Sequence, residues 1–506
     1  MGVVRSMHNF NWLRLNAWGK RGSVLAALLL LGVTAYRPAE ALPLFARQTG
    51  EACAACHTVY PELTHFGRMF KLNGYQLDNG RDIEMTNDEG KSVLSLPAVP
   101  NLALFIMADY VQFKKALPDS QIPGAQSQTG NVDFPYQVSL LYGGKIAPHF
   151  GAFAQITYSN GADTFNIDNT DFRFANTIVL PNKQPLVYGV SINNNPSVED
   201  PYNTTPAFGF PYLPPATFIP SLAAPIVEAG QAYQAAGPIG YILWNEQLYV
   251  AAGFYREART GSSSPGNPIT GNFGPIDSTT GAVLEGNNAY WRVAYEYDVG
   301  RYALMVGTYG LQFKLYPGNG LALSGATDNY TDTAFDFQFQ SIGENNSATL
   351  KGTYVKENQA LNASSAVGAA NPHDWLSYET VDLTYWYRRK LGFDVGFVNI
   401  HGSTDPTLYP SAPTQCIAGG GGTCGANLGT PGVGGVYNVG VTNSANSNPT
   451  TDAGIFEISY VPWLNVKFTL QYTHYTKFNG ASSNYDGVGR NASDNDTTFL
   501  YLWFAM

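Results

Sequence analysis

Charged side chains and cysteines are both scarce in this chain. Asp, Glu, Lys and Arg make up 13% of its 506 residues, and there are only 4 cysteines. Soluble globular domains usually carry about 25% charged residues. Here Asn, Ser, Thr, Gln and Tyr take their place, which suits a surface that is partly lipid-facing and partly a polar lumen. The formal net charge of −10 argues against nucleic acid as a partner, because nucleic acid binds to a basic face.

Long apolar runs are missing as well, apart from one near the N-terminus. Residues 23–36, SVLAALLLLGVTAY, follow a basic stretch and precede Ala39-Glu40-Ala41, a small-x-small cleavage site. This order predicts a secretory signal peptide over residues 1–41. A membrane anchor is the alternative, but a spanning helix needs ~20 apolar residues. No other run reaches that length, so we expect no transmembrane helix in the mature chain.

Most of the chain alternates apolar and polar residues. In residues 331–340, TDTAFDFQFQ, the three phenylalanines fall on one side of an extended strand, and Asp336, Gln338 and Gln340 fall on the other. A period of two residues indicates a strand with two different faces. Soluble sandwiches also alternate, with the apolar face inward. Low charge and tyrosine-rich strand ends favour a transmembrane barrel, whose apolar face points outward to lipid.

Sixteen segments show this strand pattern. They lie near residues 101–115, 131–145, 150–159, 168–181, 183–194, 229–244, 246–258, 287–299, 301–314, 331–342, 345–357, 376–388, 390–401, 451–461, 463–475 and 496–506. Tight links such as APHF and WNEQ alternate with long loops such as 195–228, 259–286 and 402–450. Short periplasmic turns and longer outer loops are typical of outer-membrane barrels. We therefore predict an all-β fold, a sixteen-stranded antiparallel barrel over residues 101–506 in the outer membrane of a Gram-negative bacterium.

Two of the four cysteines lie in one CxxCH motif. Cys53 and Cys56 are followed directly by His57, the pattern that attaches c-type haem. Two thiols at this spacing add to the two vinyl groups of a porphyrin, and the imidazole of His57 becomes the proximal iron ligand. The alternatives are a thioredoxin-like CxxC, which needs a βαβ context, a zinc site, which needs two more ligands, and a disulfide between the two cysteines.

The residues after the motif predict a short helix over 61–72, with Glu62 in its first turn. A second axial ligand of the iron stays open among four residues. These candidates are Met107, Met85, Met69 and His65. Arg47, Arg68 and Lys71 are expected either to pair with haem propionates or to be solvated.

Two further groups of residues have candidate roles. Cys416 and Cys424 fall in the loop 402–450 and are expected to form a disulfide, which an exported protein allows. Carboxylates of the lumen or loops are candidates to attract cations, although an ordinary polar lumen is the preferred explanation for each. These carboxylates are Asp109, Asp133, Asp336 and Asp382.

A sixteen-stranded barrel leaves an aqueous channel unless something fills it. Residues 42–100 have a suitable size for a helical cytochrome domain that plugs the lumen and holds one covalently bound haem c. Such a haem can meet an electron donor or acceptor outside and pass charge to a soluble carrier inside. The two halves of the sequence together predict an electron conduit made from a pore.

The stretch LPLFARQTGEACAACHTVYPELTHFGRMFKLNGYQL resembles the N-terminal signature of the fused monohaem cytochrome–porins of iron-oxidising bacteria. The matching residues are 45–50, the CxxCH motif, 61–64, 66–68 and 70–72. Beyond this stretch the likeness is architectural. The resemblance implies that Cys53, Cys56 and His57 hold the haem in the barrel. It also implies an iron(II) oxidase that takes electrons from extracellular Fe(II) and passes them to a periplasmic soluble cytochrome or cupredoxin.

Two other functions stay open at this point. One is electron exchange with other extracellular donors or acceptors. The other is a diffusion porin whose haem has a structural or sensory role.

Overall fold

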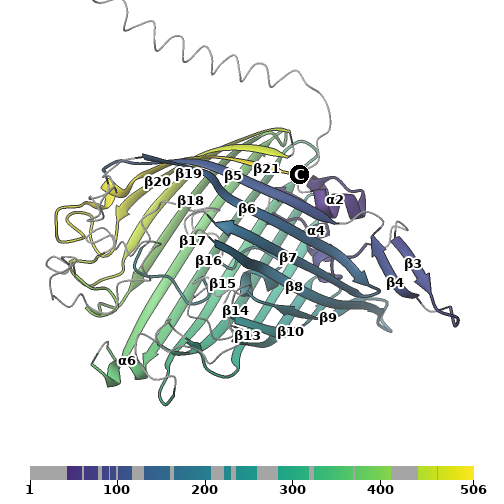
Figure 1. Ribbon diagram of the computed structural model, residues 1–506, viewed down its shortest axis with the longest axis horizontal. Coiled ribbons are helices and arrows are strands. Elements are labelled where there is room, and N and C mark those ends of the chain that lie inside the picture. Colours follow the sequence, from purple (N-terminus) through teal and green to yellow (C-terminus); the bar gives the residue numbers. More distant parts are fainter. Residues whose placement is uncertain are drawn as a thin grey trace, which may run out of the picture.

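A single closed antiparallel β-barrel forms most of the molecule (Figure 1). The computed structural model describes residues 43–59, 62–77, 82–90, 92–97, 101–116, 130–159, 164–206, 221–228, 235–258, 283–317, 324–368, 371–411, 443–463 and 465–506. The barrel strands are β5 Leu102–Phe113, β6 Gly130–Ala147, β7 Phe150–Ser159, β8 Thr164–Val179, β9 Pro185–Asn193, β10 Ala235–Trp244, β11 Leu248–Glu257, β13 Asn288–Val299, β14 Tyr302–Tyr316, β15 Asp328–Ile342, β16 Ser347–Leu361, β17 His373–Tyr387, β18 Leu391–Gly402, β19 Thr451–Trp463, β20 Val466–Lys477 and β21 Thr497–Ala505. A two-residue strand, β12 Val283–Leu284, pairs with β14.

The last strand closes the barrel against the first. β21 pairs with β5 in antiparallel register, and Ala505 lies opposite Phe105. The backbone of Met506 completes this seam, because its N–H donates to Leu104 O at 2.9 Å and its carbonyl accepts from Leu104 N. All sixteen strands predicted from the sequence are confirmed. The start of the first strand and the end of the last lie at the end of the barrel that carries the short turns.

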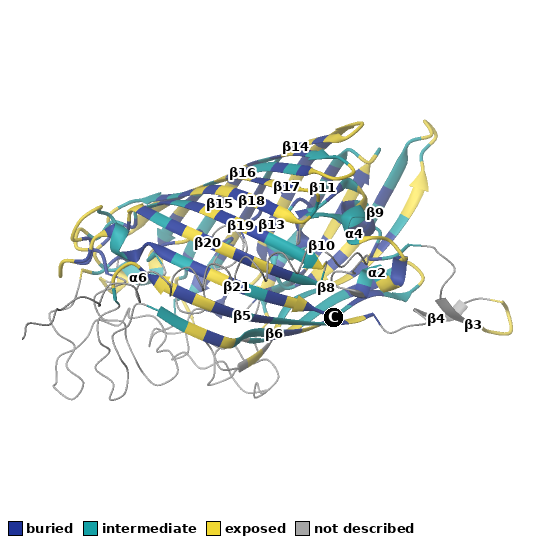
Figure 2. Cartoon of the chain, turned by 90° about the horizontal axis from the view of Figure 1, so that it is seen from above, coloured by how far each residue is buried: buried dark blue, intermediate teal, exposed yellow. Residues whose placement is uncertain are grey.

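Most strands have one exposed apolar face and one buried face, which is polar on strands such as β13 and largely apolar on β10 and β14. In β13 the side chains of Trp291 and Tyr295 are exposed, whereas Arg292 and Glu296 are buried. Figure 2 shows the same alternation along most strands. Exposed apolar surface of this extent is not tolerated in water and indicates contact with lipid. The fold is therefore a membrane-spanning barrel of the outer-membrane, porin-like type. In the described part of the chain, no helix has the length and apolar character to cross a membrane.

An N-terminal segment, residues 43–77, packs against the inner wall at the short-turn end. It contains α2 Pro43–Thr49, α3 Cys53–Cys56, β1 His57–Val59, β2 Glu62–Leu63 and α4 His65–Leu72. Glycines of the wall let it come close. A Cβ on Gly143 would lie 2.7 Å from Leu44 Cδ1, and one on Gly151 would lie 1.8 Å from Gly74 O. Any larger side chain at these two positions would push the segment away from the wall.

A small hairpin follows the N-terminal segment and lies beyond the mouth of the barrel (Figures 1 and 2). It consists of β3 Asp82–Thr86 and β4 Ser92–Pro97. Within the described part of residues 42–100, the stretch from 43 to 77 packs against the inner wall, whereas this hairpin lies beyond the mouth.

The connection between β9 and β10 differs from the long outer loop expected over 195–228. Its described parts turn into the lumen, beginning with α5 Pro196–Glu199. The carbonyl of Asp200 accepts a hydrogen bond from Lys71 Nζ at 2.8 Å, and Asn203 Oδ1 accepts one from Leu63 N at 3.2 Å. The loop folds inward because buried polar groups of the wall and of the N-terminal segment bond to its backbone and side chains. Two short helical turns, α6 Asn362–Ala366 and η2 Ala492–Asn495, lie towards the long-loop end.

The lipid-facing assignment predicts how β17 responds to charge. Leu383, whose side chain is 48% exposed, lies in the middle of the strand, and Tyr387 lies at its end. We expect Leu383→Lys to destabilise the barrel by about 2–4 kcal/mol and Tyr387→Lys by about 0–1 kcal/mol, because the penalty falls toward the membrane interface. Reversible unfolding in lipid vesicles measures both values. Equal penalties for the two variants would contradict a lipid contact at this face.

Candidate functional site

The CxxCH motif spans a short helix and the strand after it. Cys53 and Cys56 begin and end α3, and His57 continues in extended backbone with φ −128° and ψ 137°. Both cysteines and His57 are half-buried. Thr64 ties the motif to the next helix, because its backbone N–H donates to Cys56 O at 2.9 Å and its hydroxyl donates to Ala55 O at 2.5 Å.

Helix α4 begins later than the sequence suggested. The predicted helix over 61–72 is wrong at its start, because the helix runs from His65 to Leu72 and Thr64 caps it by accepting a hydrogen bond from Gly67 N. Glu62 does not lie in the first turn of the helix but in β2, which pairs with β1 across a tight hairpin. Glu62 and Leu63 pair with β1 and do not join the helix, so the helix begins at His65.

Gly67 lets α4 pack directly on the motif. A Cβ at this position would lie 2.3 Å from the carbonyl oxygen of Cys56. No side chain fits at that distance, so the closeness of the two helices requires glycine.

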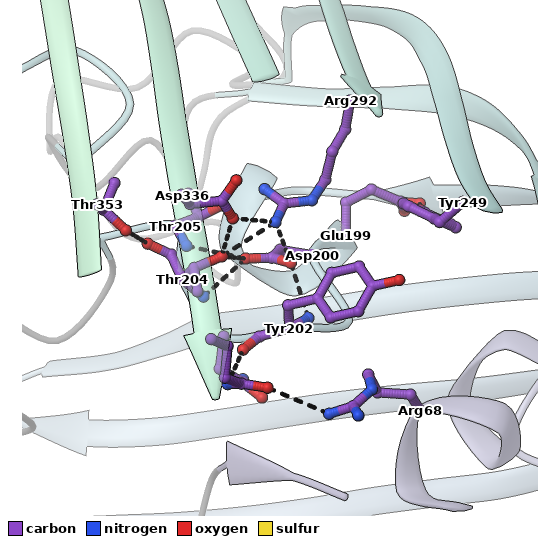
Figure 3. A network of polar contacts seen from close by, with 12 residues as sticks. Arg68, Glu199, Asp200, Tyr202, Thr204, Thr205, Tyr249, Arg292, Asp336 and Thr353 are labelled. Carbon is purple, nitrogen blue, oxygen red and sulfur yellow. Dashed lines mark hydrogen bonds and ion pairs between the residues drawn. The ribbon is translucent and has the colours of Figure 1, made fainter. Parts of the chain in front are cut away.

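Arg68 anchors α4 to the barrel. Its side chain is 2% exposed, and its guanidinium forms two hydrogen bonds to the carboxylate of Glu296, one of them from Nε at 3.0 Å. Nη1 also donates to Gln338, Gln340 and the backbone carbonyl of Leu63. Figure 3 shows Arg68 beside the ring of Tyr202, whose centroid lies 5.4 Å from the guanidinium carbon.

Two lysines make further links between the segment and the wall. Lys351 of β16 lies 2.9 Å from Glu62, whose side chain is fully buried. Lys71 donates to the carbonyl of Asp200, and burial lowers its pKa to about 8, helped by the nearby charge of Arg173. Arg68 and Lys71 are therefore buried and bonded within the protein, not solvated. Arg47 is exposed and donates a hydrogen bond from Nη1 to the backbone carbonyl of Leu102 at 2.5 Å.

His65 lies in a cluster of carboxylates at the short-turn mouth. Its Nδ1 is 3.0 Å from Asp298 and 3.2 Å from Glu296, and Nε2 is 3.8 Å from Glu246. Hydrogen bonds to Asp298 and then to Glu296 raise the pKa of His65 to about 10. A protonated imidazole has no lone pair for a metal. As arranged here, both ring nitrogens of His65 lie beside carboxylates.

The three methionine candidates lie in different environments. Met69 packs against the largest apolar cluster of the lumen, next to Leu72. Met107 is fully buried in a lumen-facing cluster that includes Trp503. Met85 lies on the hairpin outside the barrel and is 57% exposed. The choice of a second axial ligand among these three methionines and His65 stays open.

The surroundings of the motif fit a thioether-bound haem. Burial, with the neighbouring Cys53 and Glu51, raises the pKa of the Cys56 thiol to about 11, whereas redox-active CxxC thiols have a lowered pKa. Phe66 on α4 is an exposed aromatic, with its side chain 38% accessible, that a porphyrin would cover. Within the described ranges, the one group of three or more His, Cys, Asp or Glu close enough to share a metal contains no cysteine. That finding gives the zinc alternative no support.

The four candidate cation-attracting carboxylates have different neighbours. Asp336 binds Arg292 and Thr204 in the network of Figure 3. Asp382 lies 3.7 Å from Lys351. Asp109 and Asp133 lie opposite each other across β5 and β6. The predicted disulfide of Cys416 and Cys424 lies outside the described residues.

Comparison with known proteins finds likeness in architecture. No protein-family model and no curated protein matches the chain. OmpTΔL8, a loop-deletion mutant of an outer membrane protein of Vibrio cholerae, shows 9% identity over 80% of this chain and 98% of its own, with a TM-score of 0.40. OmpF of Salmonella typhi, in complex with daunomycin, shows 10% identity over 84% and 100% with a TM-score of 0.41. OprB of Pseudomonas putida shows 10% over 80% and 94% with a TM-score of 0.44. The class of this protein follows from its own closed barrel and exposed apolar face.

Removing the buried guanidinium should release the N-terminal segment. We expect Arg68→Met to weaken docking by about 1.5–3 kcal/mol, because it removes the charge-assisted hydrogen bonds to Glu296 and leaves His65 as the cationic neighbour of that carboxylate. Hydrogen exchange of residues 62–72 should rise sharply while exchange of the barrel strands stays slow. The control is Arg47→Met, which removes an exposed arginine of the same segment whose hydrogen bond goes to the backbone carbonyl of Leu102 and not to a buried carboxylate. Similar exchange in both variants would contradict the anchoring role.

Docking of the segment should also depend on pH through His65. Its folded-state pKa of about 10 lies above the ordinary value of 6.5, so its contribution is complete below pH 6.5 and is lost as the pH rises through 10. Exchange of α4 amides, corrected for intrinsic rates, should accelerate more with pH in the wild-type protein than in His65→Gln. Lys71 is common to both proteins, so the difference isolates His65. Identical pH profiles would refute this assignment.

Proposed function

We propose that this protein is an outer-membrane c-type cytochrome–porin that oxidises extracellular Fe(II) and passes the electrons to a periplasmic carrier. A haem c held by Cys53, Cys56 and His57 supplies a one-electron centre with thioether anchors and an imidazole ligand. The observation that carries the proposal is the position of the CxxCH motif. It lies on a segment that buried bonds of Arg68 and Glu62 attach to the inner wall of a membrane-spanning barrel.

Filling of the lumen favours a conduit over a diffusion pore. The N-terminal segment bonds to the wall at the short-turn end, and the loop after β9 bonds both to that segment and to the wall. Thr204 of this loop donates to Asp336, and Thr353 donates to the carbonyl of Thr204 at 2.6 Å. Elements that are bonded together in this way occupy part of the lumen and leave less room for solutes. Electrons need no open channel.

The two ends of the barrel suit different tasks. The motif lies at the short-turn end, which is periplasmic in outer-membrane barrels, so a small soluble carrier can reach it there. Fe(II) arrives from the long-loop end. Its one-electron oxidation requires no proton transfer by the protein, so the residues of this chain have to hold the centre, exclude bulk water and admit the cation.

Anaerobic titration of the purified full-length protein with Fe(II) tests this function. We expect the protein from cells competent in cytochrome c maturation to show a c-type spectrum whose α-band appears as Fe(II) is added. Cys53→Ser with Cys56→Ser should give a folded barrel without that spectrum. Substitution of Cys416 and Cys424, the other two cysteines, is the matched control and should leave the spectrum unchanged.

Two results would refute the proposal. One is a colourless wild-type protein. The other is a c-type haem that dithionite reduces and Fe(II) does not. That result would favour electron exchange with other donors or acceptors.

A further inference from the structure

Two acidic side chains face each other in the lumen near the long-loop end. Asp332 lies near the start of β15, and Glu357 lies directly opposite it on β16. Each side chain is 1% exposed. The neighbouring residues Phe335 and Tyr354 are exposed on the lipid side, so the two carboxylates point inward.

Neither carboxylate has a basic partner within the described part of the chain. The inward-folded loop supplies backbone donors instead, from Val227 N to Asp332 Oδ2 at 2.8 Å and from Ile226 N to Glu357 Oε2 at 2.6 Å. Gln359 Nε2 donates to Glu357 Oε1 at 2.6 Å. This pair differs from the carboxylates of the Arg68, Arg292 and Lys351 networks, each of which lies beside a cationic side chain.

Two buried oxygens at this place have no hydrogen-bond partner among the described residues. They are Oδ1 of Asp332 and Oε1 of Gln359, whose side chain is 6% exposed. Because Gln359 Nε2 bonds to Glu357, its amide is held beside the carboxylate pair. Buried carboxylates without a counter-charge and amide oxygens without a donor are both costly. A cation bound beside the pair would supply the missing counter-charge.

We propose that Asp332, Glu357 and the amide oxygen of Gln359 bind a divalent cation in the outer half of the lumen. Carboxylate and amide oxygens without nitrogen or sulfur ligands suit hard cations such as Mg²⁺, Mn²⁺ and Fe²⁺. The backbone donors of Ile226 and Val227 orient the two carboxylates and leave Oδ1 of Asp332 directed to the ion. Water molecules would complete the coordination shell.

The site has a role in the proposed function. Fe(II) entering from outside would be held on the lumen wall, on the membrane side opposite the periplasmic carrier. This link rests on the proposed iron oxidation, whereas the cation site itself does not.

Room-temperature electron paramagnetic resonance of Mn²⁺ tests the site in the full-length protein in detergent at neutral pH. Bound Mn²⁺ loses the six-line signal of the free ion. We expect the wild-type protein to bind one Mn²⁺ that Mg²⁺ in excess displaces, and Asp332→Asn with Glu357→Gln to bind it at least tenfold more weakly. The control is Glu344→Gln, which removes an exposed carboxylate at the short-turn end and should bind like wild type.

Equal Mn²⁺ binding by wild type and the double variant would overturn the site, and so would absence of binding by wild type. The latter result would indicate that the two carboxyl groups share a proton. If the double variant does not fold, crystals of the wild-type protein soaked in Mn²⁺ should show an anomalous peak between Asp332 and Glu357, and a map without one overturns the proposal. Normal Mn²⁺ binding without reduction by Fe(II) would refute iron oxidation and leave the cation site standing.

Discussion

The buried ion pair of Arg68 with Glu296 joins the two halves of this protein. It acts together with the pair of Lys351 and Glu62 and with the bond from Lys71 to Asp200, which hold the same segment in the barrel. The pair lies out of water, so removing Glu296 would leave a buried guanidinium without its carboxylate, a state that costs about 3–5 kcal/mol. Gln338 and Gln340 bind the remaining guanidinium N–H group, which makes a long, flexible side chain a rigid support for α4.

Polar side chains fill much of the lumen because the barrel lies in lipid. A membrane barrel exposes its apolar side chains outward, so polar residues remain for the interior. Those residues would face water in an open channel. Here they bond to the N-terminal segment and to the loop after β9. Asp200 of this loop accepts hydrogen bonds from Lys71 of the segment and from Thr204 of the loop itself. The filling is therefore a consequence of alternation on sixteen strands together with two inserted segments that present complementary groups.

The strands could be predicted because their pattern is local. A period of two along residues such as Phe335, Phe337 and Phe339 is sufficient to orient a strand, and tight turns fix its neighbours. The start of α4 could not be predicted, because Glu62 and Leu63 pair with His57 and Val59, and that pairing removes the first residues of the expected helix. The inward course of the loop after β9 depends on partners more than a hundred residues away in the chain, as in the bond between Thr204 and Asp336.

The spacing of residues along the chain is sufficient to predict the sixteen strands, their two faces, the alternation of turns and loops, and the presence of one CxxCH motif. It does not predict that Arg68 pairs with Glu296, that His65 lies beside Asp298 and Glu296, or that Asp332 and Glu357 meet beside Gln359. Charge pairing and burial bring together residues that are far apart in the sequence, and closure of the barrel sets the distances between them.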